Sequence, residues 1–144
     1  MIDMRITIIG SVKFVKDMAE LHRQLKELGH EPQMLEHMFG LADGSNKQLM
    51  REISDDHAAT KRRHDYFKRW NDLIKSGDAV LVCNLEKNGI KNYIGGNTLM
   101  EMGFAHVNDK KVFLLNPIPE DVPYTDEIKA LVDTVLDGDL ERIE

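Results

Sequence analysis

The sequence predicts an α/β domain with a mostly parallel sheet of five strands and helices on both faces. Two short apolar runs, at 79–84 and 112–115, lack polar alternation, which is typical of strands covered on both faces. Segments with helical spacing separate the predicted strands, and this alternation indicates parallel pairing. A chain of 144 residues, 42% of them hydrophobic, is long enough for one such domain over residues 1–144.

The predicted strands share apolar or β-branched residues between turn residues, and they cover 5–9, 34–35, 79–84, 112–115 and 134–136. The first strand ends at Gly10 and Ser11, which indicate a tight turn. The continuous apolar run at 79–84 predicts the central strand. The strand at 34–35 follows Pro32 and has the weakest pattern. Together these strands predict a flavodoxin-like or Rossmann-like sheet.

The predicted helices lie between these strands, at 15–28, within 46–75, from Thr98 onward and at 126–132. In the first helix apolar residues recur every three or four positions, and Gly29 ends the helix. The segment 46–75 predicts two helices, because residues 54–56 can break the run and cap a new helix. Residues 36–45 contain glycines and a few apolar anchors, which predict an irregular loop and a candidate lid.

A glycine-rich segment, Gly95-Gly96-Asn97-Thr98, leads into the helix that carries Glu101. Thr98 and Glu101 have the spacing of a capping box, which predicts that the helix begins there. The two glycines let the backbone approach a ligand closely, with free N–H groups directed at an anion. One turn inside the helix, the dipole favours an ionised Glu101, which suits a nucleophile or a base. The alternative is that Glu101 only completes the capping box.

The composition excludes several classes of protein. A net charge of −6 and a pI near 5.5 argue against general binding of a nucleic acid polymer or an acidic membrane surface. Cys83 is the single cysteine and lies in an apolar run, so we expect a buried structural thiol and no disulfide framework. The six histidines lack ligand spacing, and we expect neither a metal nor a cofactor. Without a signal-peptide layout or an apolar segment of ~20 residues, the sequence predicts a cytoplasmic protein.

A cluster of basic residues lies in the second half of the 46–75 segment and consists of Lys61, Arg62, Arg63, Lys68 and Arg69. Such a cluster is typical of a solvated helix face, and the alternatives are a phosphate pocket or a subunit contact. Tyr66 and Trp70 are expected in the core or at a subunit interface, with base stacking as the alternative. His57 and His64 are seven residues apart, which indicates surface or helix-packing roles.

The segment 96–105, together with 78–82 and 8–11, resembles the nucleoside 2-deoxyribosyltransferase superfamily, which includes 2'-deoxynucleoside 5'-phosphate N-hydrolases. The resemblance covers the first strand and most of 77–117, whereas 36–75 matches only as unspecific helix. It implies that a glutamate attacks the anomeric carbon of a (deoxy)ribose in a nucleoside or nucleoside 5'-monophosphate and releases the base. It also implies a homo-oligomer, because relatives form dimers or larger assemblies with shared pockets.

The resemblance assigns roles to residues near the motif. Glu101 matches the nucleophile, and Asp78 is similar in position to an aspartate of the family, although a turn residue at a strand start would look the same. Gly10 and Ser11 are similar to the first-loop motif that holds sugar or phosphate. Lys13 either pairs with a phosphate or is an exposed lysine at a helix start.

Further site residues follow from the topology, because ligands of such sheets bind beyond the carboxyl ends of the strands. The polar residues Asn84 and Asn116 are expected at these ends, close to the Gly95-Gly96 loop. Asn116 also matches a position where some relatives place a polar residue into a neighbouring subunit's pocket. A cap on the turn at Pro117 is the alternative.

The chain departs from the family pattern in front of the nucleophile. Gly95 stands where deoxyribosyltransferases often have an aspartate that handles the base, and Asn97 replaces a glycine. These departures favour hydrolysis over transfer to a second base. A shortened Gly-Gly-x-Thr-x-x-Glu string is also similar to lysine-decarboxylase-like phosphoribohydrolases, which likewise act on an N-glycosidic bond. A non-catalytic module that binds a nucleotide-like ligand is the alternative function.

Overall fold

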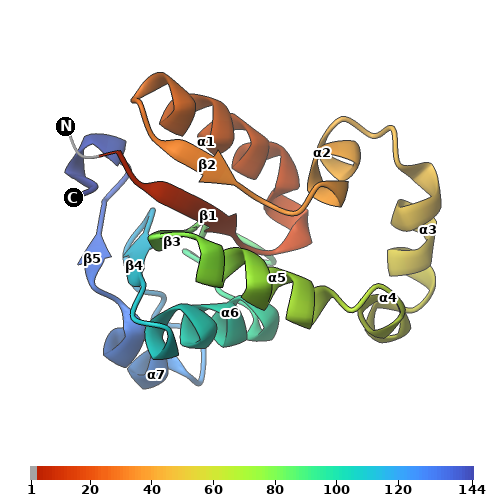
Figure 1. Ribbon diagram of the computed structural model, residues 1–144. Coiled ribbons are helices and arrows are strands. Elements are labelled where there is room, and N and C mark those ends of the chain that lie inside the picture. The colour runs from red at the N-terminus through yellow and green to blue at the C-terminus, as the bar shows by residue number, and fades with distance from the viewer. Residues whose placement is uncertain (1–2) are drawn as a thin grey trace.

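The computed structural model describes residues 3–144 and contains one parallel sheet of five strands in the order β2-β1-β3-β4-β5 (Figure 1). The strands are β1 (Arg5–Ile9), β2 (Glu31–Gln33), β3 (Ala79–Val82), β4 (Lys111–Leu114) and β5 (Thr134–Val135). This order is flavodoxin-like and confirms the predicted class. The strand β3 lies at the centre, as its continuous apolar run predicts, and all four of its residues are buried.

Seven α-helices connect and extend the sheet: α1 (Val15–Glu27), α2 (His37–Ala42), α3 (Lys47–Asp55), α4 (His57–Arg63), α5 (Tyr66–Ser76), α6 (Gly96–Val107) and α7 (Thr125–Leu131). Two short 3-10 helices, η1 (Val12–Phe14) and η2 (Leu140–Arg142), complete the described chain. Figure 1 shows α1 on one face of the sheet and α5, α6 and α7 on the other. The helices α2, α3 and α4 lie beyond the edge of this layered body.

The ends of β1 and β3 meet closely because of one glycine. A Cβ atom on Gly10 would lie 3.0 Å from the carbonyl oxygen of Cys83 and 3.3 Å from its Cβ atom. No larger residue fits there without movement of backbone. Cys83 is fully buried, as predicted, and burial raises the pKa of its thiol to about 12. This contact brings the turn after β1 next to the carboxyl end of β3.

The second strand and the segment after it differ from the sequence prediction. The strand β2 covers Glu31–Gln33 rather than 34–35, because Pro32 is tolerated in an edge strand, where its missing N–H leaves no ladder bond unmade. Residues 37–42 form the helix α2 rather than an irregular loop. Met38 and Leu41 are three positions apart, so they lie on one side of the helix, and both are buried. The packing of this side against α1 holds the short helix in place.

The segment 46–75 forms three helices rather than two. Asp56 breaks the run as predicted, and its side chain accepts a hydrogen bond from the N–H of Ala59 at 3.0 Å. A second break occurs at Asp65, which adopts the left-handed conformation with φ of 54° and separates α4 from α5. No helix of the described residues has the length and apolar character needed to cross a membrane.

Candidate active site

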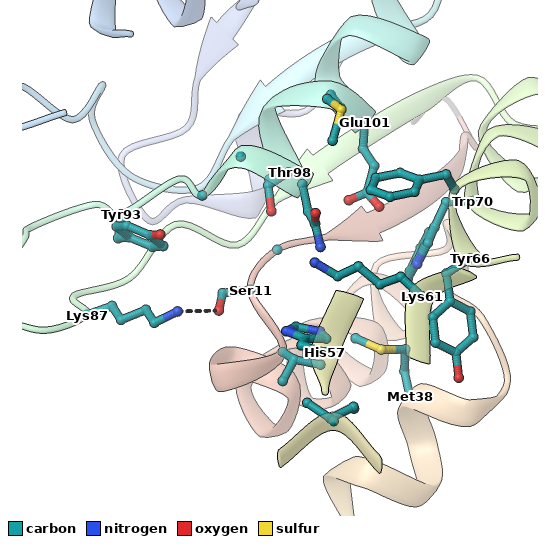
Figure 2. A pocket seen from close by; sticks show the side chains of 18 of the residues that line it. Ser11, Met38, His57, Lys61, Tyr66, Trp70, Lys87, Tyr93, Thr98 and Glu101 are labelled. Atoms are coloured by element: carbon teal, nitrogen blue, oxygen red, sulfur yellow. Dashed lines mark hydrogen bonds between the residues drawn. The ribbon is translucent and has the colours of Figure 1, made fainter. Parts of the chain in front are cut away.

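A cavity of about 360 Å³ lies beyond the carboxyl ends of the strands, between the start of α6 and the helices α2 to α5 (Figure 2). The layered body contributes Gly10, Ser11, Gly95, Gly96, Asn97, Thr98 and Glu101 to its wall. The helices on the other side contribute Met38, His57, Lys61, Tyr66, Phe67 and Trp70. The position of the cavity agrees with the rule for ligand sites in parallel sheets.

Glu101 lies in the second turn of α6, and its side chain points into the cavity (Figure 2). The residue is only 5% exposed, and no hydrogen bond joins its carboxyl group to any residue of the described chain. Burial raises the pKa of Glu101 to about 8, while the Lys61 ammonium acts in the opposite direction and lowers it. The sequence predicts a Glu101 that the helix dipole keeps ionised, whereas burial in the structure acts in the opposite direction and favours the protonated form.

The helix α6 begins three residues earlier than the capping-box spacing predicts, since that spacing makes Thr98 the N-cap. Gly95 is its N-cap and Thr98 is buried within the first turn, so Thr98 and Glu101 do not form the expected box. The structure thus removes the alternative that Glu101 serves only as a capping residue. A Cβ atom on Gly96 would meet nothing within 4 Å, so this residue leaves the cavity wall open beside the N-terminus of the helix.

Two lysines line this cavity although the protein as a whole is acidic. His57 and Lys61 come from α4, and Lys87 comes from the loop between β3 and α6. Lys87 Nζ lies 3.4 Å from Ser11 Oγ as a hydrogen-bond donor and 5.0 Å from the centre of the Tyr93 ring. Burial lowers the pKa values of His57 and Lys61, and the nearby charge of Lys87 lowers both further. An anionic ligand would relieve this mutual repulsion.

The helices α2 and α5 give the cavity an aromatic and apolar surface, which lies beside Lys61 in Figure 2. Tyr66 and Trp70 are 9% and 7% exposed, so they belong to the core, as predicted, and also line the cavity. His37 stacks on Tyr66 with ring centroids 4.2 Å apart, and its Nδ1 atom is buried without a hydrogen-bond partner. Burial lowers the pKa of His37 to about 4, so its ring is neutral at pH 7. This wall suits a flat aromatic group.

The structure leaves four predicted residues outside the cavity: Asp78 and Lys13, together with Asn84 and Asn116. Asp78 precedes β3 at the amino edge of the sheet, the edge opposite the cavity, and its carboxylate accepts a hydrogen bond from the N–H of Arg5 at 2.8 Å. It therefore ties β1 to β3 and has no place in a reaction at Glu101. Lys13 is exposed in η1 and does not line the cavity, in line with the alternative of an exposed lysine.

Asn84 and Asn116 bind each other rather than a ligand. The Asn84 side chain accepts from the N–H of Asn116 at 2.9 Å, and the Asn116 side-chain amide donates to the carbonyl of Asn84 at 3.0 Å. The Asn84 side-chain amide also donates to the carbonyls of Asn116 and Pro117. Their polar groups are thus used to join the ends of β3 and β4.

Sequence reasoning missed most residues that α2 to α5 bring to the cavity. The signal for Lys61 was the basic cluster, in which it is the one member that is not exposed. His57 was noticed but assigned a surface or packing role, and no motif marked His37, Met38 or Lys87. Within residues 3–144 the structure contains no group of three or more His, Cys, Asp or Glu side chains suited to a metal ion.

The chain was compared with models of protein families, with curated proteins and with solved structures, and none of them matches. The interpretation of the site therefore depends on the groups in its wall. Among the described residues that line the cavity, Glu101 carries the single carboxyl group, and lysine and aromatic side chains line the space around it.

Proposed function

We propose that this protein cleaves the N-glycosidic bond of a (deoxy)nucleoside or nucleoside 5'-monophosphate, with Glu101 as the nucleophile and water as the final acceptor. One observation carries the proposal: a buried carboxyl group without a protein hydrogen-bond partner opens into a cavity that two lysines and several aromatic rings also line. The resemblance of 96–105 to the deoxyribosyltransferase superfamily points to the same chemistry.

The layout of the cavity suits the three parts of a nucleotide. Figure 2 shows Ser11 and Lys87 on one side of Glu101, with Tyr66 and Trp70 on the other. A phosphate would lie by Ser11, Lys87 and the N-terminus of α6, where N–H groups and positive charge favour an anion. The sugar would then reach Glu101, and the base would contact the aromatic wall. The gathered cations favour a 5'-monophosphate over an uncharged nucleoside.

In the proposed reaction a Glu101 carboxylate oxygen forms a bond to the anomeric carbon. The bond between this carbon and the base breaks, and the base leaves with the electron pair and takes up a proton. Water then attacks the same carbon, which frees the carboxylate and gives the sugar or sugar phosphate. The first step needs the ionised carboxyl group, so kcat/KM should rise with pH up to about 8.

A direct test is incubation with a panel of nucleosides and their 5'-monophosphates, followed by chromatography of the free base. Release of base without an added acceptor would support hydrolysis, and release only with a second base would support transfer. Glu101→Gln should lower turnover about 1,000-fold or more, because the nucleophile is lost. Glu120→Gln, which neutralises an exposed loop carboxylate, is the matched control and should keep full activity.

A second candidate is a module that binds a nucleotide-like ligand without turnover. The raised pKa of Glu101 favours it, because a protonated carboxyl group donates a hydrogen bond rather than attacking a carbon. In this case no free base would appear, and Glu101→Ala would keep most of the ligand affinity. Thermal stabilisation of the protein by each nucleotide of the panel measures this affinity.

We also propose that the chain forms a homo-oligomer through the outer side of α6. Met100 and Val107 lie seven positions apart on this helix, hence on one side of it, and are 46% and 74% exposed. Met100 also lines the cavity, so a second subunit there would lie next to the site. Sedimentation of Val107→Asp beside the unchanged protein tests this contact, and equal masses would contradict it.

A further inference from the structure

Lys61 differs from the other members of the basic cluster. Arg62, Arg63, Lys68 and Arg69 are exposed, whereas Lys61 is partly buried and lines the cavity. Figure 2 shows its side chain extending from α4 across the cavity, below the carboxyl group of Glu101. The ammonium group therefore lies on the far side of the space in which Glu101 would meet a ligand.

Several other titratable groups face the same cavity. His57 accompanies Lys61 on α4, Lys87 comes from the loop before α6, and His37 and Tyr66 come from α2 and α5. Of these, Lys61 is the group whose charge acts on Glu101, and Glu101 in turn raises the pKa of Lys61. Both side chains line the same cavity, and no ion pair within 4.0 Å joins them among the described residues, so the charge of Lys61 acts on Glu101 across the open space between them.

We propose that Lys61 is a positioning residue for Glu101, whose ammonium group favours the ionised form of the Glu101 carboxyl group on the side of the cavity where the sugar would bind. This inference rests on the proposed function, because it assigns the counter-charge that a buried nucleophile requires. The Glu101 carboxyl group makes no hydrogen bond within the described chain, and Lys61 is the group whose positive charge partly offsets the cost of burying the carboxylate.

The proposal explains why the exposed basic residues cannot replace Lys61. Charges in contact with water interact weakly, because water has a high dielectric constant and salt screens them over about 10 Å, whereas charges in a cavity interact more strongly. Arg62 is the next residue on the same helix and is exposed, so it offers a matched control of equal charge. A change of charge at position 61 should alter the titration of Glu101, and the same change at position 62 should not.

The test is a titration of Glu101 by ¹³C NMR of carboxyl-labelled protein without any substrate, with Glu101→Gln used to assign the signal. Lys61→Met should raise the midpoint by about one pH unit or more, the size expected for loss of a nearby opposite charge. Lys61→Gln removes the charge but keeps a polar side chain, and it should also raise the midpoint of the Glu101 titration. Lys61→Arg should keep the midpoint near its original value, and Arg62→Met should leave it unchanged.

The outcomes separate this inference from the proposed function. An unchanged midpoint in both Lys61→Met and Lys61→Gln would overturn the role of Lys61, even if the unchanged protein releases free base. A raised midpoint in a protein that acts on no nucleoside or nucleotide would support the pair and refute the glycosidic reaction. If Lys61 only bound a phosphate, KM for the monophosphate would rise while the titration of the free protein stayed the same, which would also overturn the inference.

Discussion

Two regions of the molecule contribute to the cavity and differ in how tightly they are packed. One is the layered body, which consists of the sheet with α1, α5, α6 and α7, and the other consists of the helices α2 to α4. In the layered body, strands such as β3 are buried along their whole length, and α6 carries Glu101 on a side buried against β3 and β4. In contrast, α3 buries only Leu49, and α4 buries only Thr60. The group proposed for chemistry thus belongs to the well-packed part, and charged groups that would meet a ligand belong to the lightly packed part.

The largest expected difference between these regions is in the cost of removing a leucine side chain. Leu81 is fully buried in β3, so Leu81→Ala should lower the free energy of unfolding by about 4 to 5 kcal/mol. Leu49 lies in α3, where neighbours can move into the space, so Leu49→Ala should cost about 2 kcal/mol. Urea denaturation of both variants measures the difference, and equal losses would contradict the comparison.

The second prediction concerns the pH dependence of stability. The folded protein keeps the Glu101 proton up to about pH 8, whereas the unfolded chain releases it near the ordinary pKa of 4.5. The contribution of this group is therefore fully present below pH 4.5 and is lost as the pH rises toward 8, by up to about 1.4 kcal/mol per pH unit. Glutamine at position 101 does not titrate. The free energy of unfolding of Glu101→Gln, relative to that of the unchanged protein, should therefore rise as the pH increases from 4.5 to about 8. A difference in the free energy of unfolding between the two proteins that stays the same at all pH values would show that Glu101 is not buried as described.

A pair of glycine substitutions compares a tightly packed position, Gly10 at the end of β1, with an open position, Gly96 at the start of α6. Gly10→Ala forces a methyl group against the Cys83 backbone and should cost about 1 to 3 kcal/mol. Gly96→Ala meets no atom within 4 Å and should leave the fold as stable or slightly more stable, because alanine favours the helix. Its methyl group should instead weaken ligand binding. Thermal unfolding with and without nucleotide distinguishes the two effects.

The smallest expected effect concerns the link between α3 and the end of α4. Glu52 accepts a hydrogen bond from His64 at 3.0 Å and pairs with Arg63 at 3.2 Å, and the contact with His64 lowers the pKa of Glu52. This contribution is present above the ordinary pKa of glutamate and is lost as the pH falls. Glu52→Gln should lower the melting temperature slightly at low salt and hardly at all at high salt. A large loss of stability at any salt concentration would show that α3 and α4 are packed as firmly as the sheet.

The sequence was a good guide where one element carries its own signal. The strand β1 has the predicted bounds Arg5–Ile9, and the break at Asp56 is a side-chain cap that local spacing reveals. The short helix α2 was missed, because its burial depends on contacts with α1 that no local pattern encodes.

The candidate site was predicted in part for a related reason. The glycines and Glu101 form a contiguous motif and were found, whereas Lys61 and His37 reach the cavity only through the packing of separate helices. Asp78 shows the opposite error, since it was assigned to the site because it is similar in position to an aspartate of the resembled family. It precedes β3 and therefore lies at the edge of the sheet opposite the cavity.

The paired asparagines at the ends of β3 and β4 have a consequence for motion. Four hydrogen bonds connect Asn84 with Asn116 and Pro117 at the point where two long loops leave the sheet. The first residue of each loop is therefore held by hydrogen bonds, and the motion of the loops after β3 and β4 does not extend into the strands. Amide hydrogen exchange should be fast in the two loops and much slower in β3 and β4, with the change at Asn84 and Asn116. The strand ends beneath a bound ligand would then stay rigid while the loops around it move.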